Sequence, residues 1–190
     1  ESFSAAGTQT AALAAGGYLG TYSSDVEEYN GTAWSEVNNL PATRGFGSGS
    51  GIQTNALIFA GNAGGLTATA LRYDGTNWST EPSMSTARAN TASAQSGTAD
   101  AALGFSGYTP LSNATEEFTA SIYSPIAATW ASGGALNTAR HNLSGAGTQT
   151  AGLAVGGDPN RDVSEEYNGK HIGVNTIWPD TPIESYAVIN

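Results

Sequence analysis

The pentapeptide Glu-Glu-Tyr-Asn-Gly stands at Glu27–Gly31 and stands again at Glu165–Gly169. The tetrapeptide Gly-Thr-Gln-Thr precedes each copy, beginning at Gly7 and at Gly147. Two phrases that recur in the same order indicate an internal repeat, which is the sequence signature of solenoids, propellers and arrays. The two copies therefore set the frame in which the rest of the chain can be aligned.

The alignment divides the 190 residues into four units, at about 1–44, 45–88, 89–140 and 141–190, which we expect to form a single domain. A glycine closes an apolar run in each unit: Gly17, Gly61, Gly107 and Gly157. An aromatic residue follows ten to twelve residues later: Tyr29, Tyr73, Phe118 and Tyr167. One tryptophan then follows: Trp34, Trp78, Trp130 and Trp178. Ten residues after the first three tryptophans stands an arginine: Arg44, Arg88 and Arg140.

Each unit is predicted to contain four short strands. The first is small and polar, as in Gly45–Ser50, and the second is apolar and ends in glycine, as in Ala11–Gly17 and Ala151–Gly157. The third ends in the aromatic residue, as in Val26–Tyr29, and the fourth carries the tryptophan. Helical spacing of apolar residues is absent, and the 25 glycines disfavour long helices.

Three dipeptides connect the third strand to the fourth: Asn30-Gly31, Asp74-Gly75 and Asn168-Gly169. They predict type I′ hairpin turns, because these residue types accept the positive φ that such turns require.

Four-stranded units at this period predict an all-β fold, a β-propeller of four blades. The small residues of the first strand suit the crowded axis, and one tryptophan per blade is expected to fill the wider outer gap between blades. Four units are compatible with a closed small propeller. They are equally compatible with an arc of a larger ring that further sequence or another chain completes.

These landmarks resemble the kelch repeat, which has paired glycines after the second strand, an aromatic residue ending the third and a tryptophan on the fourth. Leu40–Arg44 (LPATR) before the next unit adds to the likeness. Gly147–Gly157, Glu165–Gly169 and Trp130–Arg140 look closer still to kelch-like arrays in tail-fibre and other virion proteins of marine bacteriophages. The resemblance covers nearly the whole chain and implies a virion or extracellular setting.

The chain departs from the kelch pattern at several points. Paired glycines are intact only at Gly16-Gly17 and Gly156-Gly157. The fourth unit has Val188 where the other units carry their arginine.

Composition restricts the partners. The chain carries 6 Lys+Arg against 16 Asp+Glu, a formal net charge of −10, which opposes binding to nucleic acid and to anionic membranes. Cysteine is absent, which rules out disulfides and thiolate metal sites. No apolar stretch is long enough to insert across a bilayer, and no cofactor is expected. The chain begins with Glu rather than Met, which indicates a processed chain or part of a longer one.

The connections between second and third strands are the candidate binding loops, predicted at Tyr18–Asp25, Asn62–Thr69, Tyr108–Thr115 and Asp158–Val163. They differ while their flanks repeat, and variable loops on a fixed scaffold often carry binding sites, although ordinary surface loops also vary. The residues expected to stack on or hydrogen-bond a sugar are Tyr18, Tyr22, Tyr108 and Arg161. A rival patch at the opposite end of the blades would use Ile122, Tyr123, Lys170 and His171.

Acidic pairs recur at Glu27-Glu28, Glu116-Glu117 and Glu165-Glu166. Neighbouring strand residues point to opposite faces, so a pair cannot converge on one catalytic or metal site. We expect one glutamate of each pair to meet a repeated arginine between blades. The only histidines are His141 and His171, no catalytic triad pattern is present, and no metal is expected.

These observations leave three hypotheses for the function. The first is a non-enzymatic adhesion or receptor-binding propeller on a phage tail fibre or other virion appendage, recognising a host-surface glycan or protein through its loops. The second is a purely structural virion or filament subunit whose loops contact sister chains in a homo-oligomer or other virion proteins. A glycan-active enzyme is the third and the least favoured.

Overall fold

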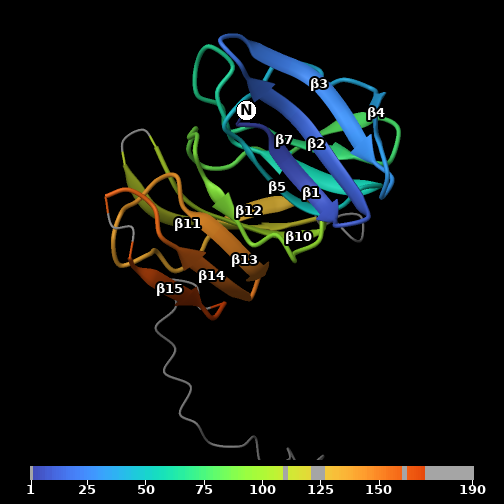
Figure 1. Ribbon diagram of the computed structural model, residues 1–190. Coiled ribbons are helices and arrows are strands. Elements are labelled where there is room, and N and C mark those ends of the chain that lie inside the picture. The colour runs from blue at the N-terminus through green and yellow to red at the C-terminus, as the bar shows by residue number, and fades with distance from the viewer. Residues whose placement is uncertain (1, 109–110, 121–126, 160–161, 170–190) are drawn as a thin grey trace, which may run out of the picture.

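The computed structural model describes residues 2–108, 111–120, 127–159 and 162–169, and its regular structure there is entirely β. The described strands form four antiparallel sheets arranged as a four-bladed β-propeller, which confirms the predicted fold. In Figure 1 the sheets follow one another from blade 1 in blue to blade 4 in orange. Among the residues with predicted roles, Arg161 and Trp178 lie outside the described part of the chain.

In every sheet the strands lie side by side in chain order. Blade 1 contains β1 (Ser4–Thr8), β2 (Ala11–Tyr18), β3 (Tyr22–Tyr29) and β4 (Trp34–Val37). Blade 2 contains β5 (Ser48–Ile52), β6 (Asn55–Phe59), β7 (Ala70–Tyr73) and β8 (Trp78–Glu81). Blade 3 contains β9 (Ala92–Ser93), β10 (Ala101–Gly107), β11 (Ser112–Thr119) and β12 (Thr129–Ser132). The described part of blade 4 contains β13 (Ser144–Thr148), β14 (Ala151–Val155) and β15 (Ser164–Tyr167).

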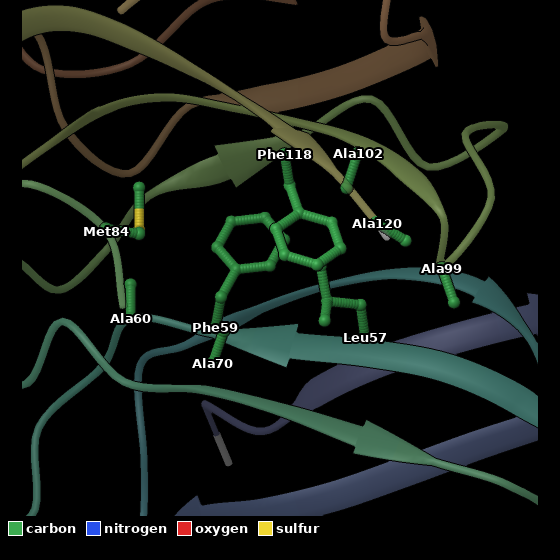
Figure 2. Packing of buried hydrophobic residues seen from close by; sticks show 9 residues of the cluster. All are labelled: Leu57, Phe59, Ala60, Ala70, Met84, Ala99, Ala102, Phe118 and Ala120. Atoms are coloured by element: carbon green, nitrogen blue, oxygen red, sulfur yellow. The ribbon is translucent and has the colours of Figure 1, made fainter. Parts of the chain in front are cut away.

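Each pair of consecutive blades encloses its own hydrophobic cluster, because alternate side chains of a strand point to opposite faces of its sheet. The cluster between blades 2 and 3 contains Phe59 and Phe118, both fully buried, with Trp130 packed against them. Figure 2 shows the two phenylalanine rings in the middle of this cluster, with Met84 on one side and Ala99 on the other. The face-to-face stacking of blades is therefore what buries the apolar surface.

Two sheet faces are not enclosed between consecutive blades. We call the face of blade 1 that points away from blade 2 the first face, and the face of blade 4 that points away from blade 3 the last face. Both carry exposed apolar side chains. Trp34, on the first, is 49% exposed, and Leu153 and Val155, on the last, are 37% and 44% exposed. The prediction that each tryptophan fills an interblade gap is therefore wrong for Trp34, whereas Trp78 and Trp130 do pack against interblade clusters. The reason is positional: Trp34 lies on the face of blade 1 that points away from blade 2.

The turns between third and fourth strands also differ from the prediction. Asn30 does not adopt positive φ, although Gly31 does, so the turn is not type I′. Instead the Asn30 side-chain oxygen accepts hydrogen bonds from the backbone N–H groups of Thr32 and Ala33, both at 3.0 Å. The result is a four-residue connection that leaves Tyr29 paired with Trp34.

A bulge near the end of the second strand explains the incomplete Gly-Gly pattern. The residue before the repeated glycine has positive φ in every blade: Gly16, Ala60, Ser106 and Gly156. The glycine that follows also has positive φ, and in blade 1 the N–H of Gly17 donates to the Arg44 carbonyl at 2.6 Å. The first position of the pair therefore tolerates Ala60 and Ser106 despite the strain of positive φ.

The innermost strands approach each other so closely that side chains become an obstacle. A Cβ atom added to Gly49 of β5 would clash with the Ala5 carbonyl of β1, and one added to Gly145 of β13 would clash with the Ser93 carbonyl of β9. Neither glycine has positive φ, so the requirement is for space rather than for an unusual backbone conformation.

Substituting alanine at Gly49 should lower the free energy of unfolding by about 1–3 kcal/mol, because neighbouring blades would have to separate. Urea denaturation of Gly49→Ala measures this loss. Gly65→Ala is the matched control, since a Cβ atom there meets open space, and its stability should stay within about 0.5 kcal/mol of the parent. Equal stability of both variants would refute the close approach of β1 and β5.

Candidate functional site

One end of the propeller carries a ring of equivalent residues, one from each blade, just before the innermost strands. Ser2, Phe46, Asn90 and Asn142 all have positive φ, between 52° and 60°. The N–H of Phe46 donates to the Ser2 carbonyl at 2.7 Å, and the N–H of Asn90 donates to the Phe46 carbonyl at 2.9 Å. These hydrogen bonds connect the first three blades through the backbone around the axis.

A depression of about 250 Å³ lies at this end of the axis. The four ring residues line it together with their neighbours Phe3, Gly47, Thr91 and Leu143. Its lining residues therefore include two asparagines and two phenylalanines. The exposed surface of the depression is more polar than apolar, which suits hydrogen bonding to a polar ligand group.

Three aromatic side chains gather beside this depression. The ring centroids of Tyr18 and Tyr22 are 4.8 Å apart, and Phe46 lies 5.5 Å from Tyr18 and 6.5 Å from Tyr22. The prediction that Tyr18 and Tyr22 are loop residues is wrong. They form a cross-strand pair that closes the hairpin of β2 and β3. The strands continue this far because β2 extends past its bulge at Gly16-Gly17 and pairs again with β3.

Tyr108 lies at the equivalent end of blade 3, in a second aromatic pair. Its ring is 5.5 Å from that of His141, and its side chain is half exposed. The structure thus places the predicted tyrosines in two patches on the same end of the propeller. Arg161 and the rival patch of Ile122, Tyr123, Lys170 and His171 lie outside the described residues.

Sequence reasoning missed Phe46 and the ring of residues to which it belongs. A signal was present, because Asn90 and Asn142 each stand two residues after a repeated arginine, as Phe46 does. Asparagine tolerates positive φ better than most residues, so this pair indicated a special backbone conformation.

The repeated arginines lie between blades rather than at the loop end. Arg88 Nη2 binds Glu116 Oε1 at 2.6 Å, and Arg140 Nη2 binds Glu165 Oε1 at 2.7 Å. The predicted pairing of one glutamate with a repeated arginine is therefore right for two arginines. Burial lowers the pKa of the Arg88 guanidinium, and the charge of Glu116 opposes that shift.

Arg44 makes a different set of contacts, which corrects the prediction for the first arginine. Its Nη1 donates to the carbonyls of Ala60 and Thr69, both at 3.0 Å, and Nη2 donates to the Thr69 hydroxyl. Blade 2 carries Leu71 where blades 3 and 4 carry their glutamate, so Arg44 pairs with no carboxylate of the described residues. Burial without such a partner lowers the pKa of Arg44 to about 10.

The second glutamate of two acidic pairs binds a tyrosine of the next blade. Tyr73 Oη donates to Glu28 Oε1 at 2.9 Å, and Tyr167 Oη donates to Glu117 Oε1. Burial raises the pKa of Tyr73 to about 12, and the hydrogen bond to Glu28 adds to the shift. The pKa of Tyr167 is raised for the same reasons. In the pair Glu116-Glu117 both glutamates therefore join blades, one on each face of the sheet.

The described residues hold no group of three or more His, Cys, Asp or Glu side chains placed to bind a metal ion. They include no helix long and apolar enough to cross a membrane. The residues at this end of the propeller offer aromatic stacking and hydrogen bonding, from tyrosine rings and hydroxyls and from asparagine amides.

Comparison with known proteins places the chain in no group, since no family model matches the sequence and no curated protein matches it significantly.

Proposed function

We propose that the chain is a non-enzymatic recognition module of a phage tail fibre or other virion appendage, and that it binds a host-surface glycan or protein. The binding surface would be the end of the propeller that carries the axial depression and the two tyrosine patches. The virion setting rests on the resemblance of the repeats to kelch-like arrays of phage proteins.

The observation that carries the proposal is the cluster of Tyr18, Tyr22 and Phe46 beside the depression. A pyranose ring presents C–H groups on its faces and hydroxyls on its edge. Tyrosine combines an apolar ring with a hydroxyl that both donates and accepts, so it matches both parts of a sugar. The asparagines of the depression add amide groups that suit sugar hydroxyls.

Binding of the labelled chain to a panel of marine bacterial cells, with a glycan array in parallel, tests this proposal. We expect selective binding that falls about tenfold or more in Tyr18→Ala, Tyr22→Ala and Tyr108→Ala, because each removes an aromatic anchor. Ile52→Ala is the matched control, since this exposed apolar residue lies at the opposite end of β5. Binding that survives all three tyrosine substitutions would contradict the assignment of the surface.

A structural virion or filament subunit is the second candidate, and one observation favours it. Leu153 and Val155 on the last face of blade 4 are exposed, and so is Trp34 on the first face of blade 1. By strand register, these faces correspond to the faces that are buried between the other blades. Such faces are suited to stacking against another protein. A stable oligomer that buries these residues, from a chain that binds no cell and no glycan, would favour this candidate over the first.

A further inference from the structure

The three repeated arginines occupy equivalent sites, each formed by the blade that follows the arginine. Arg140 shows the whole arrangement: Nη1 donates to the carbonyls of Gly156 and Val163 at 2.8 and 2.9 Å, and Nη2 binds Glu165. The two carbonyls belong to the bulge of the second strand and to the residue just before the third strand. The two carbonyls and the carboxylate thus accept hydrogen bonds from both terminal nitrogens of the guanidinium.

Strand register identifies the corresponding atoms in each blade. The glutamate is always paired with the strand residue two positions before the bulge: Ala154 with Glu165 in blade 4, and Gly104 with Glu116 in blade 3. In blade 1 the same position pairs Ala14 with Glu27. The acceptors in blade 1 are therefore the Gly16 carbonyl, the Asp25 carbonyl and the Glu27 carboxylate.

The three acceptors of blade 1 form a fourth site of the same kind, and this site is exposed at the surface. A groove of about 720 Å³ covers it, lined among others by Gly16, Asp25, Glu27 and Trp34. Glu27 is exposed and makes no hydrogen bond or ion pair with any described residue, unlike Glu116 and Glu165. The Asp25 carboxylate, which has no counterpart in the other blades, accepts a 3.3 Å hydrogen bond from Asn39 and adds negative charge.

We propose that this groove binds the guanidinium group of an arginine presented by another polypeptide. The acceptor set is the one that holds Arg140: a carboxylate, which accepts a charge-assisted hydrogen bond, and two carbonyls. Three separate acceptors favour the planar guanidinium, which has several N–H donors in a fixed arrangement, over the single ammonium of lysine. The net charge of −10 also favours a cationic partner segment.

The arginines of the described part of the chain are engaged elsewhere. Arg44, Arg88 and Arg140 fill the sites of blades 2 to 4, and Arg72 binds Glu81 and Asp100 at 2.7 and 2.8 Å. In the sequence Val188 stands where the fourth unit would supply an arginine to the next blade. The occupant we assign is an arginine-bearing segment of a partner protein, and the role does not depend on glycan recognition at the loop end.

The test is titration of the full-length, isotope-labelled chain with N-acetyl-arginine amide, and in parallel with N-acetyl-lysine amide, followed by amide chemical shifts. We expect saturable shifts at Gly16, Gly17 and Asp25 and at the Trp34 indole with the arginine probe, and weaker shifts with lysine. Glu27→Gln should weaken arginine binding on the order of tenfold, because it removes the charged acceptor. Its melting temperature should stay unchanged, since Glu27 is exposed.

Glu166→Gln is the matched control, because it removes an exposed carboxylate from the last face of blade 4, away from the groove. Equal binding of the two probes, or equal binding by Glu27→Gln and the parent chain, would overturn the proposal in favour of general electrostatic attraction. Absence of shifts at saturating arginine would overturn it outright. If the chain self-associates and Glu27→Gln abolishes this self-association, the assignment of a partner protein is overturned, and the arginine comes from a second copy of the chain.

Discussion

Replacing Arg88 with alanine should lower the free energy of unfolding by about 3–5 kcal/mol. Arg88 and Glu116 are both about 2% exposed, so the substitution leaves a buried carboxylate without its counter-ion. The Ser85 N–H, which also donates to Glu116 at 2.7 Å, cannot compensate for the lost charge. Urea denaturation should show the loss as a lower midpoint, and the melting temperature should fall by about 2–4 °C per kcal/mol.

Two further variants separate the ion pair from simple loss of packing. Arg88→Met combined with Glu116→Leu replaces the pair by apolar side chains of similar size, and its stability should recover to near that of the parent. Blade 2 already carries Leu71 at the position of Glu116, which shows that the sheet accepts leucine there. A double variant as unstable as Arg88→Ala would contradict this account, as would full stability of Arg88→Ala itself.

Replacing Phe59 with alanine should cost a similar 3–5 kcal/mol. The Phe59 side chain is fully buried between blades 2 and 3, with its ring centroid 5.0 Å from that of Trp130 in an edge-on arrangement. Its ring also fills the space over Gly104, where an added Cβ atom would lie 2.8 Å from the ring. Truncation therefore opens a cavity in the cluster that joins the two blades, and the strands around it cannot collapse fully.

The measurement is again urea denaturation, with Trp130 fluorescence as a local readout because this indole packs on Phe59. Leu19→Ala is the control, since Leu19 is 80% exposed and its truncation should change stability by about 0.5 kcal/mol or less. A cost below about 1 kcal/mol for Phe59→Ala would mean that blades 2 and 3 do not depend on this cluster.

The candidate site was only partly accessible to sequence reasoning. The variable connections between second and third strands indicate Tyr18, Tyr22 and Tyr108, and the structure places all three at one end of the propeller, Tyr18 and Tyr22 in strands rather than in a loop. Their division into two patches, and the presence of Phe46 in one of them, depend on contacts between residues of different blades. Such contacts leave no local periodicity in the sequence.

The sequence by itself determined the number of units and the order of the strands in each. It could do so because every blade repeats the same alternation of side chains, and this alternation is a local property of the backbone. It also indicated the ion pairs of Arg88 and Arg140, whose partners repeat with the same period.

Only the tertiary structure decided what lies against each face. Trp34 and Trp78 occupy the same position of the repeat, yet one is half exposed and the other packs between blades. Glu27 and Glu165 stand in the same pentapeptide, yet only Glu165 meets an arginine. The physical reason is that a strand's sequence sets which side chains share a face, whereas burial and charge pairing depend on the neighbouring blade, and the first face of blade 1 points away from blade 2.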